Sequence, residues 1–307
     1  MNETLINSLE KLNFCKYRFN LVFHEKTELP EYHGSFLRGT FGTALKEMFC
    51  INESKDCKSC LSINKCNYPI IFERDLINEN SPPHFYVIEI GKLSDNFLFF
   101  DIILLSEGLN YLSEIIYAVK KMGTIGFGYK RHKFSLSTVE YIDMDNSEIT
   151  VYKAGNEKIK KHTTFNIKNL NFDYGNKIKI VFKTPVAIKS KNTLLIELDF
   201  SSFFKSLIHR ISGLFEHFFH QKLDIVFDDY LESSKNIETI EKKFEFVKLD
   251  RYSNRREEKV FLTGTKGYIV FSGNLEKFLP FIVLCQYIHT GKATTFGFGQ
   301  YEIENLN

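Results

Sequence analysis

The chain has 307 residues, of which 43% are apolar and 25% are charged, and its formal net charge is +2. This length suits two domains of about 150 residues each, and the composition excludes disordered and fibrous classes of protein. The small net charge excludes a protein that attracts nucleic acid through its total charge, so a nucleic-acid surface would have to come from local clusters of cations.

The N-terminal residues lack a basic segment followed by an apolar core, and no apolar run in the sequence reaches the roughly 18 residues that span a bilayer. We therefore expect a cytoplasmic protein that does not bind a membrane. In that compartment the six cysteines of the chain are expected to be thiols or metal ligands, not a disulfide framework.

The first half of the chain is predicted to contain the order strand, helix, two strands, helix, strand. Alternating apolar residues predict strands over 16–24, 84–90, 96–105 and 133–142, and helical spacing predicts helices over 36–49 and 109–123. Inside the first helix, Gly39 and Gly42 each cost about 1 kcal/mol relative to Ala, which indicates that another backbone or a ligand approaches closely. This order is the split βαβ pattern of a ferredoxin-like domain.

The same order repeats after a polar segment, 143–174, that is typical of a hairpin and a linker. Strands are predicted over 177–188, 242–252 and 260–271 and at the C-terminal end, with helices over 203–219 and 275–288. We therefore expect an α+β fold of two tandem ferredoxin-like domains, residues 1–165 and 166–307.

A glycine-rich loop follows each domain's second helix. The longer one runs from Gly291 to Gly299 and ends in Gly-Phe-Gly, and the shorter one reads MGTIGFGY from Met122 to Tyr129. Glycine tolerates positive φ and has no Cβ, so its N–H groups can point outward at an anion such as a phosphate. The repetition supports a duplicated fold in which both loops occupy equivalent positions.

Four cysteines form a C-x6-C-x2-C-x5-C cluster between residues 50 and 66, namely Cys50, Cys57, Cys60 and Cys66. Four thiolates on a short polar segment can close a tetrahedral site, so structural zinc is predicted here. An Fe–S cluster also uses four thiolates and is an alternative, as are four reduced cysteines in a surface loop. Because four protein ligands leave no open position, the metal would have no catalytic role.

Basic residues stand among aromatic residues beside both glycine loops. Cations neutralise phosphates and aromatic rings stack on bases, which is the chemistry of single-stranded RNA recognition. The alternative interpretation is that these basic residues are ordinary solvated charges on strand edges. This interpretation is strongest for 242–259, because acidic residues occur there too. The candidates are Lys120, Lys121, Lys130, Arg131, His132 and Lys133 in the first half, and Arg251, Arg255, Arg256 and Lys292 in the second.

Three histidines are candidates for a general acid or base, since histidine titrates near neutral pH. His209 lies on the helix face that also carries Lys205, opposite Leu207, and is predicted to be exposed. His33 stands beside Tyr32 at the start of the first helix, whose N-terminus favours anions. His289 stands beside the long glycine loop and could equally cap a helix.

Four segments of the chain resemble the CRISPR-associated endoribonucleases of the RAMP superfamily that process precursor crRNA. They are LPEYHGSFLRGTFGTAL (29–45), CKSCLSINKCNYPIIFE (57–73), RYSNRREEKVFLTGTKGYIVFSG (251–273) and FLPFIVLCQYIHTGKATTFGFGQYEI (278–303). The first domain then resembles the variant of this family with a cysteine-rich insertion. The resemblance implies two ferredoxin-like domains of the RRM-like, RAMP kind, in agreement with the repeat.

The activity implied by the resemblance is sequence-specific cleavage of CRISPR repeat RNA without a catalytic metal. The 2′-hydroxyl attacks the adjacent phosphate and leaves a 2′,3′-cyclic phosphate and a 5′-hydroxyl, so DNA is not a substrate. The reaction needs a base, an acid and cations around the phosphorane. The alternative function is a non-catalytic RAMP subunit that binds crRNA together with other CRISPR effector subunits.

The resemblance also suggests roles for particular residues. The family's glycine-rich loop, which contacts RNA, matches Gly291, Lys292, Gly297 and Gly299. The family's active site often combines a histidine with a tyrosine or lysine near the first helix, the region of Tyr32, His33, Arg38 and Lys46 here. His33 or His209 is then the acid or base, with Tyr32 or Lys46 assisting.

Overall fold

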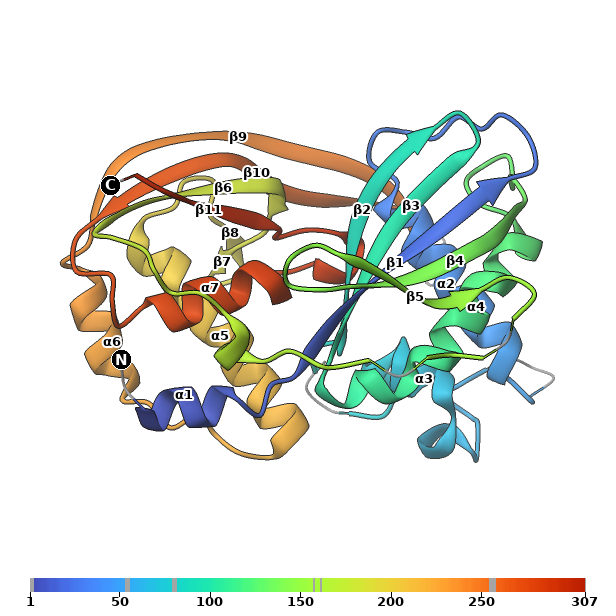
Figure 1. Ribbon diagram of the computed structural model, residues 1–307, viewed down its shortest axis with the longest axis horizontal. Coiled ribbons are helices and arrows are strands. Elements are labelled where there is room, and N and C mark those ends of the chain that lie inside the picture. Colours follow the sequence, from blue (N-terminus) through green and yellow to red (C-terminus); the bar gives the residue numbers. More distant parts are fainter. Residues whose placement is uncertain are drawn as a thin grey trace. The chain divides into compact units, whose positions relative to one another are not determined.

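The computed structural model describes residues 3–52, 56–78, 82–156, 158–160, 162–253 and 258–306. It divides into two compact units (Figure 1). The N-terminal unit is Phe14–Thr164, and the C-terminal unit joins Met1–Asn13 to Phe165–Asn307. Within the described ranges, none of the helices combines the length and the apolar character that crossing a membrane requires.

The first residues of the chain group with the C-terminal unit, whereas the sequence-based division places them in the first domain. The helix α1 (Glu3–Leu9) buries Leu5 and Leu9. Just beyond it, Glu10 forms a 2.6 Å ion pair with Lys168, and Lys11 donates a 2.8 Å hydrogen bond to Gln221. These contacts join residues more than 150 positions apart, which no local sequence pattern reports.

The N-terminal unit is a five-stranded antiparallel sheet with two main helices. Its strands are β1 (Phe14–Phe23), β2 (Tyr86–Ser94), β3 (Phe97–Leu105), β4 (Phe134–Ile142) and β5 (Glu148–Lys153), in the order β2-β3-β1-β4-β5. Its helices are α2 (Gly34–Phe49), the short α3 (Asn67–Ile71) and α4 (Leu112–Ile125). The first four strands and the two long helices have the ferredoxin-like arrangement, so this prediction is confirmed.

The packing of α2 explains one of its two internal glycines. A Cβ at Gly42 would lie 2.2 Å from the Cζ atom of Phe72, so the helix can approach this ring only because residue 42 is glycine. The close neighbour is therefore a side chain, not a backbone or a ligand. At Gly39 no other part of the described chain approaches closely, because a Cβ there would meet nothing within 4 Å.

The C-terminal unit repeats the same topology. Its main strands are β6 (Lys177–Val186), β9 (Glu238–Ser253), β10 (Glu258–Ser272) and β11 (Tyr301–Asn305), in the order β11-β6-β10-β9, and its helices include α5 (Phe200–Phe219), α6 (Phe227–Ser234) and α7 (Leu279–Ile288). A two-stranded hairpin, β7 (Lys189–Ser190) and β8 (Thr193–Leu194), follows β6. Both units therefore have the ferredoxin-like fold that the repeat predicts.

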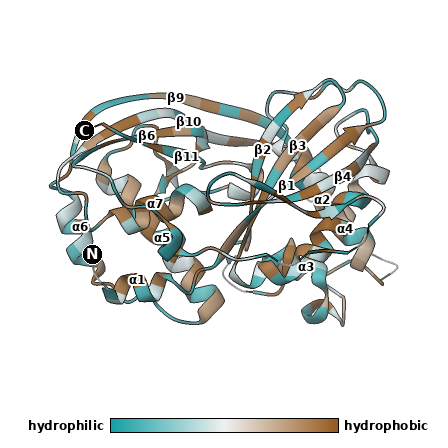
Figure 2. Cartoon of the chain, in the orientation of Figure 1, coloured by the Kyte–Doolittle hydropathy of each residue, from teal (hydrophilic) through white to brown (hydrophobic). Residues whose placement is uncertain are grey.

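Local sequence explains where α5 begins and which face it buries. Asp199 caps the helix by accepting a 2.7 Å hydrogen bond from the N–H of Ser202, while the Ser202 hydroxyl accepts one from the N–H of Asp199. The buried face of the helix places Phe203 against Phe271 and Tyr301. The brown, apolar stretches of α5 and α7 are visible in Figure 2. The opposite face of α5 is left to solvent.

The two glycine loops have matching backbone conformations. Gly126 and Gly297 both have φ of +92°, and Gly128 and Gly299 have φ of +73° and +79°. A Cβ at Gly299 would lie 1.9 Å from the carbonyl oxygen of Thr290, so this position needs glycine for the loop to close on itself. The repetition seen in the sequence is therefore a repetition of structure.

Two N–H groups of the longer loop, those of Gly297 and Gly299, are bonded within the chain and are not open to an anion. The N–H of Gly297 donates to the carbonyl of Thr294 at 3.1 Å, and the N–H of Gly299 donates to the carbonyl of Pro185 at 2.8 Å. Both donors are therefore used inside the chain. Gly297 and Gly299 thus shape the loop and do not offer their N–H groups to an anion.

Candidate functional site

The edge of α5 that carries Ser206 lies against the glycine-rich loop of the C-terminal unit. The hydroxyl groups of Ser206 and Thr290 are 3.0 Å apart and share a hydrogen bond. The neighbouring Lys292 is anchored by its N–H, which donates a 2.9 Å hydrogen bond to the carbonyl of Ala187 at the end of β6. These contacts fix the loop, and with it the lysine side chain, relative to the helix.

Three exposed cationic or titratable side chains meet at this junction. Lys205 and His209 are one turn apart on α5, and Lys292 comes from the loop. Burial is the main cause that lowers the pKa of His209, and the nearby charges of Lys205 and Lys292 lower it further. In the part of the chain that the structure describes, none of the three forms an ion pair with a carboxylate. We call Lys205, His209 and Lys292 the cationic cluster.

A fourth cation lies next to the cluster and was not anticipated from the sequence. The Arg210 guanidinium donates a 3.4 Å hydrogen bond to the carbonyl of Ile288 at the end of α7, and its Nε atom is buried without a described partner. Burial lowers the pKa of Arg210 to about 10, an effect that the nearby Cys285 opposes. Arg210, which is half-buried and forms no described ion pair with a carboxylate, adds positive charge next to His209 on α5.

His33 occupies a different kind of place. It is the residue before α2, only 3% of its surface is exposed, and its Nδ1 atom lies 3.3 Å from the carbonyl of Pro30. Its Nε2 atom is buried without a described partner, and its ring packs edge-on against Phe127. Burial lowers the pKa of His33, although hydrogen bonds to Pro30 and Glu31 oppose the shift. Burial also raises the pKa of the adjacent Tyr32.

Lys46 and Arg38 lie further along α2 and are not gathered around His33. The Nζ atom of Lys46 is 5.6 Å from the centre of the Tyr68 ring, and the Arg38 guanidinium lies 4.3 Å from the centre of the Phe72 ring. Lys46 is about 20 Å from His33 along the helix axis at 1.5 Å per residue. The structure therefore does not bring His33 and Lys46 together into one active site.

The remaining predicted RNA-binding cations fall into two places. Lys130 and Arg131 are exposed in the turn after the first glycine loop, beside Tyr129, which is 83% exposed. In the C-terminal unit, the guanidinium of Arg251 lies 4.7 Å from the centre of the Phe296 ring in the long glycine loop. Arg255 and Arg256 lie outside the described residues.

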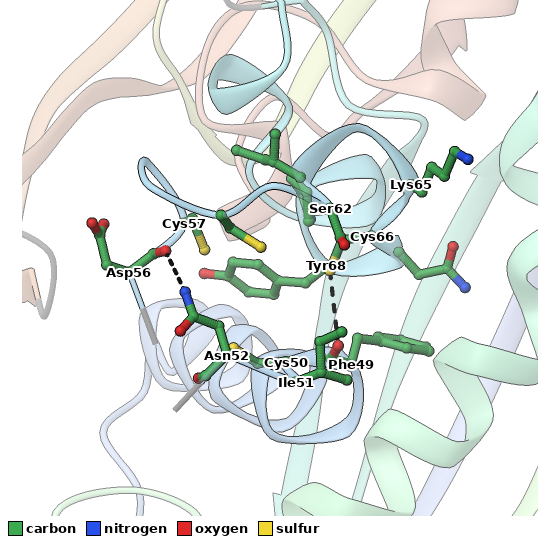
Figure 3. Close-up of a pocket in the computed structure, with 14 residues that line it drawn as sticks. Phe49, Cys50, Ile51, Asn52, Asp56, Cys57, Ser62, Lys65, Cys66 and Tyr68 are labelled. Carbon is green, nitrogen blue, oxygen red and sulfur yellow. Dashed lines mark hydrogen bonds between the residues drawn. The ribbon is translucent and has the colours of Figure 1, made fainter. Parts of the chain in front are cut away.

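The four cysteines line a single cavity of about 200 Å³ beyond the C-terminal end of α2 (Figure 3). Cys50, Cys57 and Cys66 come from separate segments around the ring of Tyr68. Burial raises the pKa of Cys57, with further contributions from Glu73 and from the Cys50 and Cys66 thiols, while Lys46 opposes the shift. Among the described residues, however, no three histidine, cysteine or acidic side chains converge as ligands of a shared metal ion.

Comparisons with known proteins match both halves of the chain. Residues 12–164 match a family model described as an N-terminal domain, and residues 180–301 match the model of the CRISPR-associated endoribonuclease Cas6. An uncharacterised protein of Archaeoglobus fulgidus is 21% identical over 300 residues, covering 92% of this chain and 96% of its own length.

Solved structures agree with the family models on the fold. A Cas6 product complex superposes with a TM-score of 0.59 at 12% identity and covers 95% of this chain and 99% of its own. Thermus thermophilus Cas6 gives a TM-score of 0.56 at 12% identity, with the same coverage. A partial Cas6-RT-Cas1–Cas2 complex gives 0.56 at 13% identity, covering 96% of this chain and 46% of its own.

Two tandem ferredoxin-like units with a glycine-rich loop after the last helix are the fold that this chain shares with the solved Cas6 structures. Residues 180–301, which match the Cas6 family model, include α5 and the whole glycine loop. The cationic cluster therefore lies entirely inside the segment that carries the family match. The comparisons do not test the cysteine-rich insertion, which stays a prediction.

Proposed function

We propose that the chain is an endoribonuclease that cleaves CRISPR repeat RNA in precursor transcripts to give crRNA. The observation that carries this proposal is the cationic cluster of Lys205, His209 and Lys292, since it stands beside the glycine-rich loop inside the Cas6-matched segment. Such a cluster, without a described carboxylate to neutralise it, is suited to a phosphodiester.

The proposed reaction starts with the 2′-hydroxyl next to the scissile phosphate. Neutral His209 accepts the proton of this hydroxyl, whose oxygen attacks the phosphorus and displaces the 5′-oxygen of the following nucleotide. Lys205 and Lys292 stabilise the charge that accumulates on the phosphorane, and a protonated lysine can donate the proton that the leaving oxygen needs. The products are a 2′,3′-cyclic phosphate and a 5′-hydroxyl.

The protonation state of His209 supports its role as a base. Burial and the two lysines lower its pKa, so the imidazole is neutral and can accept a proton at physiological pH. These side chains supply the acid, the base and the positive charge, so we propose cleavage without a catalytic metal. His33 is the weaker candidate, because a side chain that is 3% exposed cannot contact the substrate without rearrangement.

Cleavage of a labelled CRISPR repeat RNA in excess EDTA tests the proposal. Wild-type protein is expected to cut this RNA and to spare the same RNA with a 2′-deoxy substitution at the cut site. His209→Ala should lower the rate by about 10²-fold or more, the usual contribution of a general acid or base. His217→Ala, which removes a second histidine from α5, should retain the wild-type rate.

Each outcome of the assay is informative. Loss of activity in His33→Ala together with a full rate in His209→Ala would contradict the assignment of the base. Tight, salt-sensitive binding without cleavage would contradict the enzyme and support an RNA-binding RAMP subunit that works with other CRISPR effector subunits. A requirement for a divalent cation would contradict the metal-independent reaction.

A further inference from the structure

The cysteine cavity is formed by segments that the fold brings together from separate positions. Cys50 is the residue after α2, Cys57 and Cys60 belong to the following turn, and Cys66 directly precedes α3. The turn is closed by the N–H of Cys60, which donates a 3.3 Å hydrogen bond to the carbonyl of Cys57. A group bound to all four sulfurs would therefore connect α2, the turn and α3.

Two of the four thiols, those of Cys50 and Cys66, form weak hydrogen bonds to backbone carbonyls. The Sγ atom of Cys50 lies 3.5 Å from the carbonyl of Asn52, and the Sγ atom of Cys66 lies 3.9 Å from the carbonyl of Phe49. Only a protonated thiol can donate such a bond, and a metal ion displaces the proton from each ligand. Metal binding would thus abolish these two bonds and free both side chains to turn into the cavity.

We propose that Cys50, Cys57, Cys60 and Cys66 bind one zinc ion tetrahedrally, with the side chains of Cys50 and Cys66 rotating into the cavity on binding. All four cysteines line the same cavity of about 200 Å³, and no cysteine of the cavity is engaged in a disulfide. Four thiolates favour zinc among the common divalent ions.

The bound ion has a structural role that is separate from RNA cleavage. Four protein ligands leave no coordination position for a substrate. The ion instead fixes α3 and the residues after it on α2, where Phe72 packs into the space at Gly42 and Tyr68 lies near Lys46. Because the cationic cluster belongs to the other unit, the zinc site and the proposed cleavage can fail independently.

Metal analysis of anaerobically purified full-length protein tests the site. About one equivalent of zinc per chain is expected, and Cys57→Ser and Cys60→Ser should each lose most of it. Cys15→Ser is the matched control, since Cys15 is a buried cysteine of the same unit whose thiol bonds to the carbonyl of Thr163, a role that serine can keep. This control should retain the zinc.

Cobalt substitution gives a readout that depends on the ligands and not on activity. The cobalt protein should absorb through thiolate-to-metal charge transfer, and four thiols of the wild type should be protected from alkylation until a chelator is added. If the serine variants fail to fold, the number of wild-type thiols protected from alkylation still shows whether four cysteines bind a metal ion. Absence of metal, equal metal in Cys57→Ser and Cys15→Ser, or iron with inorganic sulfide would overturn the proposal.

Discussion

At the scale of single residues, the side chains of the cationic cluster interact electrostatically with one another even without substrate. Burial lowers the pKa of His209, and Lys205 and Lys292 lower it further, because a cation near an imidazole disfavours its protonated form. The same lysines are suited to the phosphate that the histidine must approach. Charge repulsion within the cluster is therefore part of its chemistry, and a phosphate relieves it.

The pH profile of cleavage should reveal this interaction. If neutral His209 is the base, kcat/KM rises with pH through the His209 pKa and then levels off. Lys292→Ala removes one of the causes that lower this pKa, so the acidic limb of its profile should move to higher pH than in the wild type. The measurement is single-turnover cleavage of repeat RNA across a pH series.

Lys168→Ala serves as the matched control, because Lys168 in the same unit is paired with Glu10 and is not among the residues that shift the His209 pKa. Its profile should coincide with that of the wild type. An acidic limb that stays in place in Lys292→Ala, or that moves to lower pH, would show that the titrating group is not His209 in this environment.

The two glycines of α2 should respond to alanine in opposite directions. Gly42→Ala places a Cβ 2.2 Å from the ring of Phe72, and such overpacking costs about 1–3 kcal/mol, more than the helix propensity of alanine returns. Gly39→Ala meets nothing within 4 Å and should gain up to about 1 kcal/mol. Urea unfolding of both variants measures the difference, and equal midpoints would contradict the packing described for α2.

At the scale of elements, the long glycine loop holds Lys292 in place through its own backbone contacts. Its Gly297 and Gly299 N–H groups are bonded within the chain, and Gly299 closes against the backbone of Thr290. The glycines are thus required by the shape of the loop, while its charge comes from Lys292. A substitution that deforms the loop should affect both stability and substrate binding.

Alanine at Gly299 is expected to be strongly destabilising. The residue has φ of +79°, which costs alanine about 1–2 kcal/mol, and the new Cβ would lie 1.9 Å from a backbone oxygen that cannot move alone. Gly155→Ala, at φ of +84° with nothing within 4 Å, should show only the conformational cost. Thermal unfolding compares them, and a smaller loss of stability at Gly299 than at Gly155 would refute this account.

The elements were largely predictable because hydrophobic periodicity is local. The strands of both sheets except β5, and the helices α2, α4, α5 and α7, follow from apolar spacing, and the Gly-Phe-Gly repetition indicated the matching loop conformations. The strand β5 lies in the polar segment that was predicted as a hairpin and a linker. Short elements such as α3 and α6 were missed, since a single helical turn or two carries little periodicity. The grouping of α1 with the C-terminal unit depends on contacts made far along the chain.

The candidate site was predictable only in part, for a related physical reason. The exposure of His209 follows from its position on the helix face, and Lys205 follows from the spacing of one turn. The approach of Lys292 to His209 is a tertiary contact across the unit, so the sequence alone could not report it. The burial of His33 depends likewise on packing against Phe127.

At the scale of the whole molecule, a net charge of +2 means that RNA affinity must arise locally. Many of the described surface lysines are already paired with carboxylates, as Lys235 is with Glu232 and Lys179 with Glu304. Pairing of this kind cancels long-range attraction. The cationic cluster of Lys205, His209 and Lys292 would then account for a disproportionate share of phosphate binding.

The salt dependence of RNA binding tests this distribution of charge. Each phosphate contact on a single strand contributes about 0.7 to the slope of log Kd against log salt concentration. Lys205→Ala and Lys292→Ala should each reduce the slope by about that amount. Lys235→Ala, which removes a lysine already paired with Glu232, should leave the slope unchanged, because its charge releases no counterions from RNA. If all three variants changed the slope equally, binding would follow total charge, and the cationic cluster would have no special place in the contact with RNA.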